Sequence, residues 1–353
     1  MKIPWYVKAV RAPEAMEKVA AEIGEAADWQ GVTIAHLDTG FTNHAVFNLL
    51  TSRPALRTAD GMNFVDAGVT EPRDPLNYGG GLAEYPGHGT RTAGVLCGNL
   101  RGEFVGLCPT VPVVPYRITN SVMLTGQTIV NAALAIMDAV DRNLADVISI
   151  SLGVQSVIGN RKQMHALGRA VDHAYERGVI VVAAGGQTDD APQLVGFEVY
   201  PARYSRAIGA GGINEALKIC YDYEIGREDI DVWAPADNII RPNSILGQPE
   251  PFTHIGNKAD GTSYATVHVA AGAAMWLRMR GVELEEKGYV GWRRVEAFRS
   301  LLRSSARKLK GNDVRRKDPP TRTGILDCLA LIEAQLPALS SLKEAPRAEP
   351  EVD

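Results

Sequence analysis

Three polar side chains in the sequence have the types and the order that nucleophilic catalysis requires. Asp38 ends an apolar run, His88 stands between two glycines, and Ser263 precedes a long apolar run that indicates a buried helix. A serine hydroxyl is a weak nucleophile, but an imidazole can take its proton while a carboxylate orients that imidazole. The order Asp38, His88, Ser263 therefore predicts attack on a carbonyl carbon.

The segment Asp38-Thr39-Gly40 also matches enzymes in which two carboxylates share one proton. Such a site needs a second matching loop, but Asp-Thr-Gly occurs once in the chain and Asp-Ser-Gly does not occur. A homodimer could supply the second loop, although that chemistry belongs to all-β proteins and we expect an α/β chain. The paired-carboxylate interpretation is therefore disfavoured.

The segment around Ser263 is similar to the Gly-x-Ser-x-Gly turn of another hydrolase class, in which the histidine follows the serine. Only His268 lies downstream, and from its place on the same helix it cannot readily turn back to Ser263. We expect His268 to be a packed core histidine. Structural or solvated roles are expected for the remaining histidines: His36, His44, His165, His173 and His254.

Short apolar runs alternate with longer segments of helical periodicity, which predicts a parallel sheet covered by helices. The expected strands are Val32–Leu37, Val111–Tyr116, Val147–Ile150, Val179–Ala183 and Ala207–Ile213. The expected helices are Thr90–Cys97, Thr128–Arg142, Lys162–Arg177, Thr266–Arg280 and the basic Arg293–Lys310. The predicted fold class is α/β, a single three-layer domain with a mostly parallel central sheet and helices on both faces.

This domain is expected to span residues 1–335, because residues 336–353 are rich in proline and glutamate and predict a disordered tail. The formal charge of −4 over 353 residues provides no field that would attract nucleic acid or an anionic membrane. The basic segment 293–310 lacks interleaved aromatic residues, so a solvated outer face is favoured over a nucleic-acid surface. The expected partner is a peptide or protein substrate, and the oligomeric state is not indicated.

The sequence carries no sign of secretion or membrane insertion. Its N-terminus lacks the apolar core of a signal peptide, and no segment approaches the roughly 20 apolar residues of a membrane span. The four cysteines are widely spaced and are expected to be free thiols: Cys97, Cys108, Cys220 and Cys328. We therefore expect a cytoplasmic protein, unless a leader has been removed from the chain.

Taken together, these segments resemble the subtilisin-like serine proteases, in particular their intracellular bacterial members without a long propeptide. The matching segments, in chain order, are TIAHLDTG, GHGTRTAGVLCG, DVISISLG, VIVVAAGG, YPARYSRAIGAGGI, DVWAPA, GTSYATVHVAAG and TGILDCLALI. Such a set of motifs in the right order, over residues 4–335, is highly specific. The resemblance implies a serine endopeptidase that uses Asp38, His88 and Ser263 as a triad and passes through an acyl-enzyme.

The resemblance also implies where an extended substrate binds. Ser151-Leu152-Gly153 would pair with the substrate backbone as an added strand. Thr125 and Gly126 would form the opposite rim of the cleft. Val199 would form the floor of the pocket for the residue that precedes the scissile bond, so an apolar residue is expected there.

The sequence departs from the family at the oxyanion segment, where family members carry asparagine after Ala-Ala-Gly and this chain carries Gly186. Gln187 has the same carboxamide on a longer side chain, and two consecutive glycines could let the loop shift to present it. A solvated Gln187, with a backbone N–H or water as the second donor, is equally compatible with the sequence. Val267 replaces the family's proline near the start of the serine helix, and no folding propeptide is recognised.

Two alternatives to an active endopeptidase stay open. One is a binding protein with weakened chemistry, favoured by Gly186, and the other is a peptide transferase or macrocyclase that uses the same triad. A transferase needs a cap that excludes water, and no large insertion for one is evident. The chemistry requires no cofactor. Four residues could bind structural calcium, although a solvated acidic loop is favoured and no metal ligand is assigned: Asp60, Asp66, Glu71 and Asp74.

Overall fold

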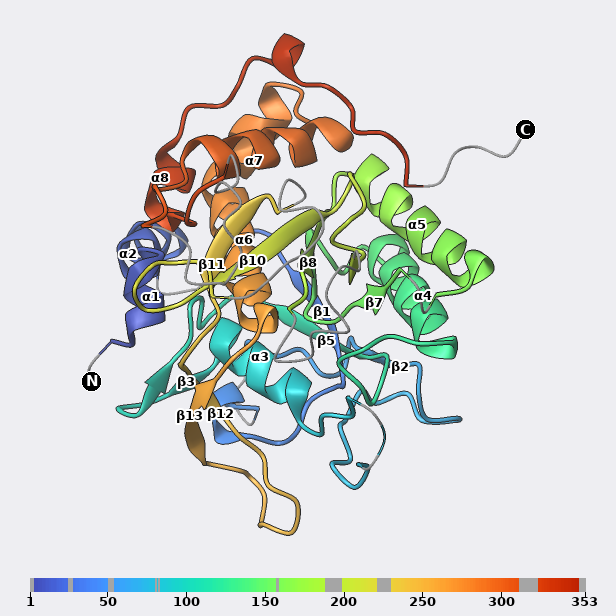
Figure 1. Cartoon of the computed structure of the whole chain (residues 1–353). Coiled ribbons are helices and arrows are strands. Elements are labelled where there is room, and N and C mark those ends of the chain that lie inside the picture. Colours follow the sequence, from blue (N-terminus) through green and yellow to red (C-terminus); the bar gives the residue numbers. More distant parts are fainter. Residues whose placement is uncertain are drawn as a thin grey trace.

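Seven parallel strands form the central sheet, in the order β11-β10-β8-β6-β1-β5-β2 (Figure 1). The computed structural model describes residues 3–24, 28–49, 54–79, 81, 83–156, 159–187, 199–220, 230–310 and 323–348. The strands of this sheet are β1 Ile34–Asp38, β2 Met62–Asn63, β5 Val113–Arg117, β6 Val147–Ile150, β8 Ile180–Ala184, β10 Ile208–Ile213 and β11 Val232–Pro235. The inner strands are buried along their whole length, as expected for a parallel sheet covered on both faces.

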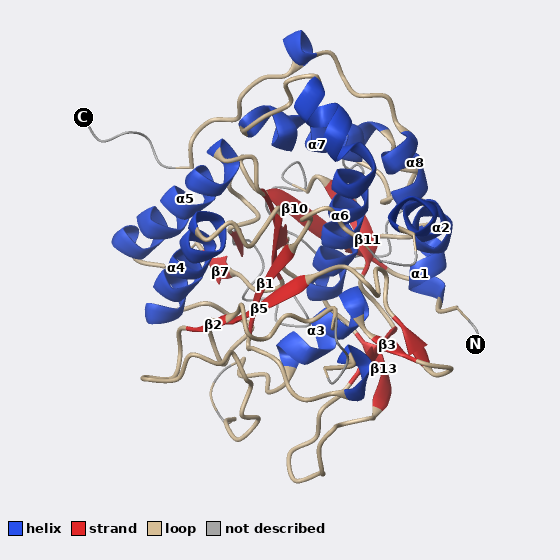
Figure 2. Cartoon of the chain, turned by 180° about the vertical axis from the view of Figure 1, so that it is seen from behind, coloured by secondary structure: helices blue, strands red, loops and turns tan. Residues whose placement is uncertain are grey.

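Helices cover both faces of this sheet (Figure 2). On one face lie α4 Gln127–Asp141 and α5 Arg161–Glu176, which also pack against each other. The other face carries α3 His88–Cys97 and α6 Thr262–Glu286, with α1 Trp5–Ala9, α2 Ala12–Ile23, α7 Trp292–Ser304 and α8 Cys328–Glu333 extending the same layer. The predicted three-layer α/β fold with a mostly parallel sheet is therefore confirmed.

Consecutive residues of β1 face the two helical layers alternately. Ile34 belongs to the apolar cluster around α6, whereas Ala35 and Leu37 belong to the cluster around α4 and α5. Because side chains alternate along a strand, His36 and Asp38 face the same layer as Ile34. β1 therefore presents Asp38, at its carboxyl end, to the layer that holds α3 and α6.

The helix α6 runs through the centre of the molecule and is buried over most of its 25 residues. It is longer than the predicted Thr266–Arg280 at both ends. Gly261, with φ 143°, precedes its first residue. At the other end, Glu283 accepts hydrogen bonds from Arg280 at 2.7 Å and from Lys287 at 2.6 Å. Ion pairs at this spacing stabilise an exposed helical turn, which accounts for the extension.

Three separate two-stranded antiparallel sheets are described besides the central sheet. They pair β3 Asn99–Leu100 with β4 Phe104–Val105, β7 Val154–Gln155 with β9 Val199–Tyr200, and β12 Ile239–Pro242 with β13 Ile255–Ala259. Two short 3-10 turns are η1 Ala45–Phe47 and η4 Leu339–Ser341. The five predicted strands are all present, with ends displaced by at most two residues. None of these pairs was predicted; the strands of the first two pairs have two residues each, which carry too little periodicity to be recognised.

The basic helix α7 ends at Ser304, before the predicted Lys310. Its arginines are not simply a solvated face, because Arg299 is buried and lies 2.8 Å from the buried carboxylate of Asp231. Arg303 reaches the same carboxylate at 2.6 Å. The charge of α7 is thus partly neutralised inside the protein, which argues further against a nucleic-acid surface.

Residues 336–348 cross from α8 over α7 to α5, where composition predicted a disordered tail (Figure 1). The guanidinium of Arg206, only 2% exposed, donates to the carbonyl of Ala345 at 3.0 Å and to Glu344 at 2.8 Å. The hydroxyl of Tyr175 accepts from the N–H of Ala345 at 2.8 Å. The tail prediction is wrong for this stretch, because a buried arginine needs these acceptors. Residues 349–353 lie outside the described part.

The four cysteines are free in the structure, as predicted, and all but Cys220 are buried. Burial raises the pKa of the Cys97 thiol to about 12, so this thiol stays protonated and unreactive near neutral pH. Within the described residues, no helix has the length and apolar character to cross a bilayer.

Candidate active site

Asp38, His88 and Ser263 come together at the carboxyl ends of the strands. The Nδ1 of His88 lies 2.7 Å from Oδ1 of Asp38, and its Nε2 lies 3.1 Å from Oγ of Ser263. A carboxylate can only accept, so Nδ1 carries the hydrogen and Nε2 presents a lone pair to the serine. An imidazole held in this way can remove the hydroxyl proton as the oxygen attacks an electrophile.

Asp38 is fully buried and is held by several donors. Its Oδ1 accepts from the N–H of Thr39 at 2.7 Å as well as from His88, and its Oδ2 accepts from the hydroxyl of Thr92 at 3.3 Å. Burial by itself would raise the pKa of Asp38, but the imidazole of His88 and these hydrogen bonds hold it below its ordinary value. Asp38 therefore stays ionised through the neutral range and keeps His88 in one orientation.

Two glycines bring His88 to this position at the start of α3. Gly87 has φ 75°, a left-handed conformation that other residues adopt only with strain. A Cβ on Gly89 would lie 2.1 Å from the carbonyl oxygen of Gly40 and 3.1 Å from Cβ of Asp38. Only glycine at this position lets the first turn of α3 rest directly on the loop that follows β1.

Ser263 lies in the first turn of α6, where backbone N–H groups have no partner within the helix. Its hydroxyl donates to the carbonyl of Ser151 at 2.8 Å, and the hydroxyl of Ser151 donates back to the carbonyl of Ser263 at 2.9 Å. The single hydroxyl hydrogen of Ser263 is therefore shared between two acceptors, Ser151 O and His88 Nε2. The reciprocal pair fixes Ser263 against the segment that follows β6.

A cleft of about 330 Å³ opens over this group. Ser151, Leu152, Gly153 and Val199 line it, as predicted. Thr125 and Gly126, expected at the opposite rim, are not among the described residues that line this cleft, and the backbone N–H of Thr125 donates to Oγ1 of Thr128 at the start of α4. Gly126 is the N-cap of that helix. Val122 and Met123 line the cleft, and the substrate-binding roles expected from the sequence stay predictions.

The edge of Gly153 is already paired within the protein. Its carbonyl accepts from the N–H of Leu124 at 2.8 Å, and its N–H donates to the carbonyl of Val122 at 3.4 Å. A substrate strand that pairs with Gly153 on this edge has to replace both contacts.

Val199, which lines the cleft, lies close to two glycines. A Cβ added at Gly186 would lie 2.6 Å from Cγ2 of Val199, and one added at Gly153 would lie 2.4 Å from its Cγ1. Gly186 also has φ 85°. An asparagine at residue 186 would therefore collide with β9 and strain the backbone, which explains why this chain has glycine there.

Gln187 follows Gly186 and lies beside the start of α6. Its Oε1 accepts from the N–H of Thr262 at 2.7 Å, so this contact fixes which end of the carboxamide is oxygen. Gln187 also lines the cleft together with Ser263. The carboxamide is thus held next to the nucleophile on the side where the α6 N-terminus favours negative charge.

Three of the four acidic residues considered for calcium have other side-chain contacts. Asp66 lies 2.8 Å from Nε of Arg117, Glu71 lies 3.3 Å from Arg73, and Asp74 accepts from the hydroxyl of Thr39 at 2.7 Å. Within the described residues, no three His, Cys, Asp or Glu side chains are grouped as metal ligands would be. The lack of a cofactor requirement stays a prediction.

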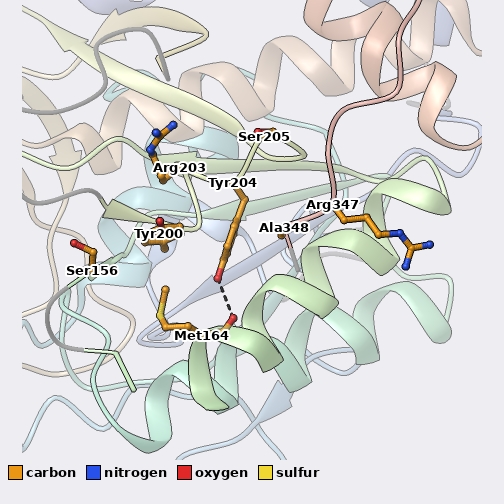
Figure 3. A pocket seen from close by; sticks show the side chains of 8 residues that line it. All are labelled: Ser156, Met164, Tyr200, Arg203, Tyr204, Ser205, Arg347 and Ala348. Carbon is orange, nitrogen blue, oxygen red and sulfur yellow. Dashed lines mark hydrogen bonds between the residues drawn. The ribbon is translucent and has the colours of Figure 1, made fainter. Parts of the chain in front are cut away.

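A second pocket, of about 420 Å³, is lined by none of Asp38, His88 and Ser263, and Figure 3 shows its lining side chains. Its lining residues are Ser156, Met164, Tyr200, Arg203, Tyr204, Ser205, Arg347 and Ala348. The hydroxyl of Tyr204 donates to the carbonyl of Met164 at 2.9 Å, and the guanidinium groups of Arg203 and Arg347 point away from each other. None of the described lining residues is a histidine, so they provide no base to activate its serines.

Comparison with known proteins agrees with this geometry. Residues 29–318 match the family model described as the subtilase family. The chain belongs to the subtilase family. This subtilase is 28% identical over 323 residues to the major intracellular serine protease of Bacillus subtilis (strain 168), which covers 88% of this chain and 86% of the relative. It is 27% identical over 274 residues to Subtilisin Savinase of Lederbergia lenta, with coverages of 77% and 83%. The subtilase is thus a serine endopeptidase, as predicted.

Solved structures share its fold. MycP1 with the N-terminal propeptide removed superposes with a TM-score of 0.66 at 21% identity, over 95% of this subtilase and 98% of that chain. The prenylagaramide maturation protease PagA superposes with a TM-score of 0.61 at 20% identity, over 90% and 98%. At these identities the likeness shows the fold alone, and it confirms the predicted subtilisin-like architecture.

The structure also brings residues to the site that sequence reasoning did not select. Tyr85 lines the cleft and meets the ring of His88 edge-on, with centroids 5.7 Å apart. Thr92 donates to Asp38, and His36 lies next to both. The helical spacing of His88 and Thr92 and the strand spacing of His36 and Asp38 are signals that place each pair on one face. The predicted core role of His268 is confirmed, since it is fully buried.

Proposed function

We propose that this subtilase cleaves peptide bonds in extended polypeptide segments through the triad Asp38, His88 and Ser263 and an acyl-enzyme intermediate. The observation that carries the proposal is the position of the His88 ring, 2.7 Å from Asp38 and 3.1 Å from Ser263. Both distances lie within hydrogen-bond reach, which general-base activation of a serine requires. Peptide or protein substrates follow from the family.

In the proposed reaction, Oγ of Ser263 forms a bond to the carbonyl carbon while its proton moves to Nε2 of His88. The resulting imidazolium is stabilised by Asp38 and then gives this proton to the leaving amine as the C–N bond breaks. The acyl group stays on Ser263 as an ester. Water then attacks the ester, with His88 again taking and returning one proton, and the carboxylic acid product leaves.

Two donors are proposed for the oxyanion of the tetrahedral intermediate. The backbone N–H of Ser263, at the start of α6, is one. The carboxamide nitrogen of Gln187 is the other, supported by the contact that holds the opposite end of this amide on Thr262. Gly186 provides the turn that carries Gln187 to the cleft.

The substrate backbone is proposed to lie along Ser151-Leu152-Gly153, in the place that residues 122–124 now occupy beside Gly153. A substrate N–H that donates to the carbonyl of Ser151 would compete with the hydroxyl of Ser263, which lies 2.8 Å away. The hydroxyl hydrogen would then turn to His88. Substrate binding would in this way complete the activation of the nucleophile.

The test is turnover of an extended fluorogenic peptide by purified wild-type, Ser263→Ala and His88→Ala protein. In a subtilisin, removing either residue costs on the order of a millionfold in kcat, and we expect a loss of that order here. Ser341→Ala, an exposed serine on η4, is the matched control and should keep wild-type turnover. Unchanged turnover by folded Ser263→Ala would end the proposal.

The cytoplasmic location expected from the sequence stays a prediction. Its support is the Bacillus subtilis relative, which is named as an intracellular serine protease.

A further inference from the structure

A second histidine lies buried beside the proposed triad. His36 precedes Asp38 by two residues on β1, so both side chains project toward α3. His36 is 2% exposed and Asp38 is 0% exposed. Burying a polar ring in the sheet interior costs free energy unless its nitrogens form hydrogen bonds.

The contacts of His36 lead to Asp38 through one hydroxyl. Nε2 of His36 lies 2.9 Å from Oγ1 of Thr92, and Oγ1 lies 3.3 Å from Oδ2 of Asp38. Nε2 itself is 3.7 Å from the same Oδ2. The hydroxyl of Thr92 is also 3.0 Å from the carbonyl of His88, so the carboxylate competes with a backbone acceptor for its hydrogen.

The surroundings of the ring select one tautomer of His36. Its Nδ1 is buried without a hydrogen-bond partner among the described residues. A buried N–H without a partner is less tolerable than a lone pair without one, so the hydrogen belongs on Nε2. In that tautomer Nε2–H donates to Thr92 and turns its positive end to Asp38. Donation to Oγ1 also strengthens the O–H of Thr92 as a donor.

We propose that His36 is a positioning residue of this subtilase, which acts through Thr92 on Oδ2 of Asp38 and so leaves Oδ1 to orient His88. The Oδ1 oxygen accepts from Thr39 and His88, whereas Oδ2 depends on Thr92 and the neighbouring Nε2–H. With both oxygens anchored, the carboxylate cannot rotate. The imidazole of His88 is then held toward Ser263.

The charges around His36 favour its neutral form. Burial lowers the pKa of His36, while Asp38 on its own strand and the carbonyl of Gly89 oppose this shift and His88 on α3 reinforces it. On the adjacent strands its register partners are Pro115 and Ser149, which carry no charge. His36 therefore acts near neutral pH as a hydrogen-bond donor and not as a second cation competing for Asp38.

This role has a kinetic signature. Donors on Oδ2 draw negative charge away from Oδ1, so their loss leaves Asp38 a stronger partner for the imidazolium of His88. The acid limb of kcat/KM should then move to higher pH. A carboxylate that can rotate also orients His88 less well, so kcat should fall while KM changes little.

The test compares variants with and without a donor at each position. Thr92→Val removes the hydroxyl and keeps the shape, and His36→Met removes the ring donor at similar length. Each should lower kcat about tenfold and move the acid limb upward, since a hydrogen bond to a charged group is worth about 1.5 to 3 kcal/mol. His36→Gln, with an amide donor near the place of Nε2, and Thr92→Ser should recover most of the loss.

Because His36 and Thr92 act in series, the double variant His36→Met/Thr92→Val should lose little more than either single variant. The inference rests on the proposed function, and wild-type turnover separates the two. A folded wild type without turnover would contradict the proposed function. An active wild type whose Thr92→Val or His36→Met variant keeps its pH profile, with only the melting temperature lowered, shows that His36 merely packs.

Discussion

At the scale of single residues, Gly186, Gln187 and Val199 determine the shape of the cleft where the oxyanion is proposed to form. The left-handed φ of 85° and the 2.6 Å approach of Val199 exclude a side chain at residue 186. The next residue, Gln187, carries a carboxamide whose Oε1 accepts from the N–H of Thr262 at 2.7 Å. If Gln187 is the donor, as proposed, the close packing of Val199 on Gly186 explains why the donor is displaced by one residue.

Gln187→Ala should lower kcat and leave KM almost unchanged, because an oxyanion exists only after attack has begun. Removing one such donor from a subtilisin costs about 100- to 1000-fold in kcat, and we expect a loss in this range. Gln187→Glu is the matched control, since it keeps an acceptor for the N–H of Thr262 but has no donor. Steady-state kinetics that show full activity for Gln187→Glu would mean that Gln187 only caps α6.

At the scale of elements, the strands and helices that carry the site follow from local signals. Apolar runs predicted β1 and β6, and small residues after Gly89 predicted α3. Each of Asp38, His88 and Ser263 stands at the end of such an element, so its position was predicted with the element. Parallel strands then bring these ends to one edge of the sheet.

Contacts between elements could not be predicted in the same way. The chain segment 122–124 pairs with Gly153, and β9 pairs with β7, through backbone groups that leave no periodic pattern in the sequence. For this reason the sequence did not reveal that Val122 and Met123 line the cleft. The contact of His36 with Thr92 likewise joins β1 to α3 across a long separation in sequence.

The element β9 should set which residue precedes the scissile bond. With Val199, which lies against both Gly153 and Gly186, as the predicted pocket floor, small apolar residues should be preferred. Val199→Ala should deepen the pocket and raise kcat/KM for leucine or phenylalanine relative to alanine, by about tenfold, since one buried methylene changes selectivity by about 10- to 200-fold. Peptide-library digests measure this ratio. An unaltered ratio would place the pocket elsewhere.

At the scale of the whole molecule, two buried histidines should limit stability in acid. Burial lowers the pKa of His44 and of His268 to about 4 in the folded protein, whereas an exposed histidine titrates near 6.5. Between these values the unfolded chain binds protons that the folded protein does not. The stabilising contribution of neutral burial is therefore present at pH 7.5, falls as the pH drops below about 6.5, and is fully lost near pH 4.

Linkage gives about 2 kcal/mol of unfolding free energy lost per histidine between pH 7.5 and 5. Urea unfolding at the two pH values measures the loss, and His268→Leu should show a drop smaller by about this amount. The comparison between pH values matters here, because the substitution also removes the contact of His268 with the carbonyl of Tyr264 at 2.7 Å. An equal drop in the variant would show that folding does not lower the pKa of His268.

The central claim, that His88 activates Ser263 in the folded protein, is tested most directly by the intact mass after reaction with diisopropyl fluorophosphate. Only a serine whose proton is taken by a base attacks this reagent readily. The wild type should gain a single phosphoryl adduct on Ser263, and Ser263→Ala and the heat-unfolded protein should gain none. A folded wild type that stays unlabelled, or a Ser263→Ala variant that is labelled equally, would contradict the account.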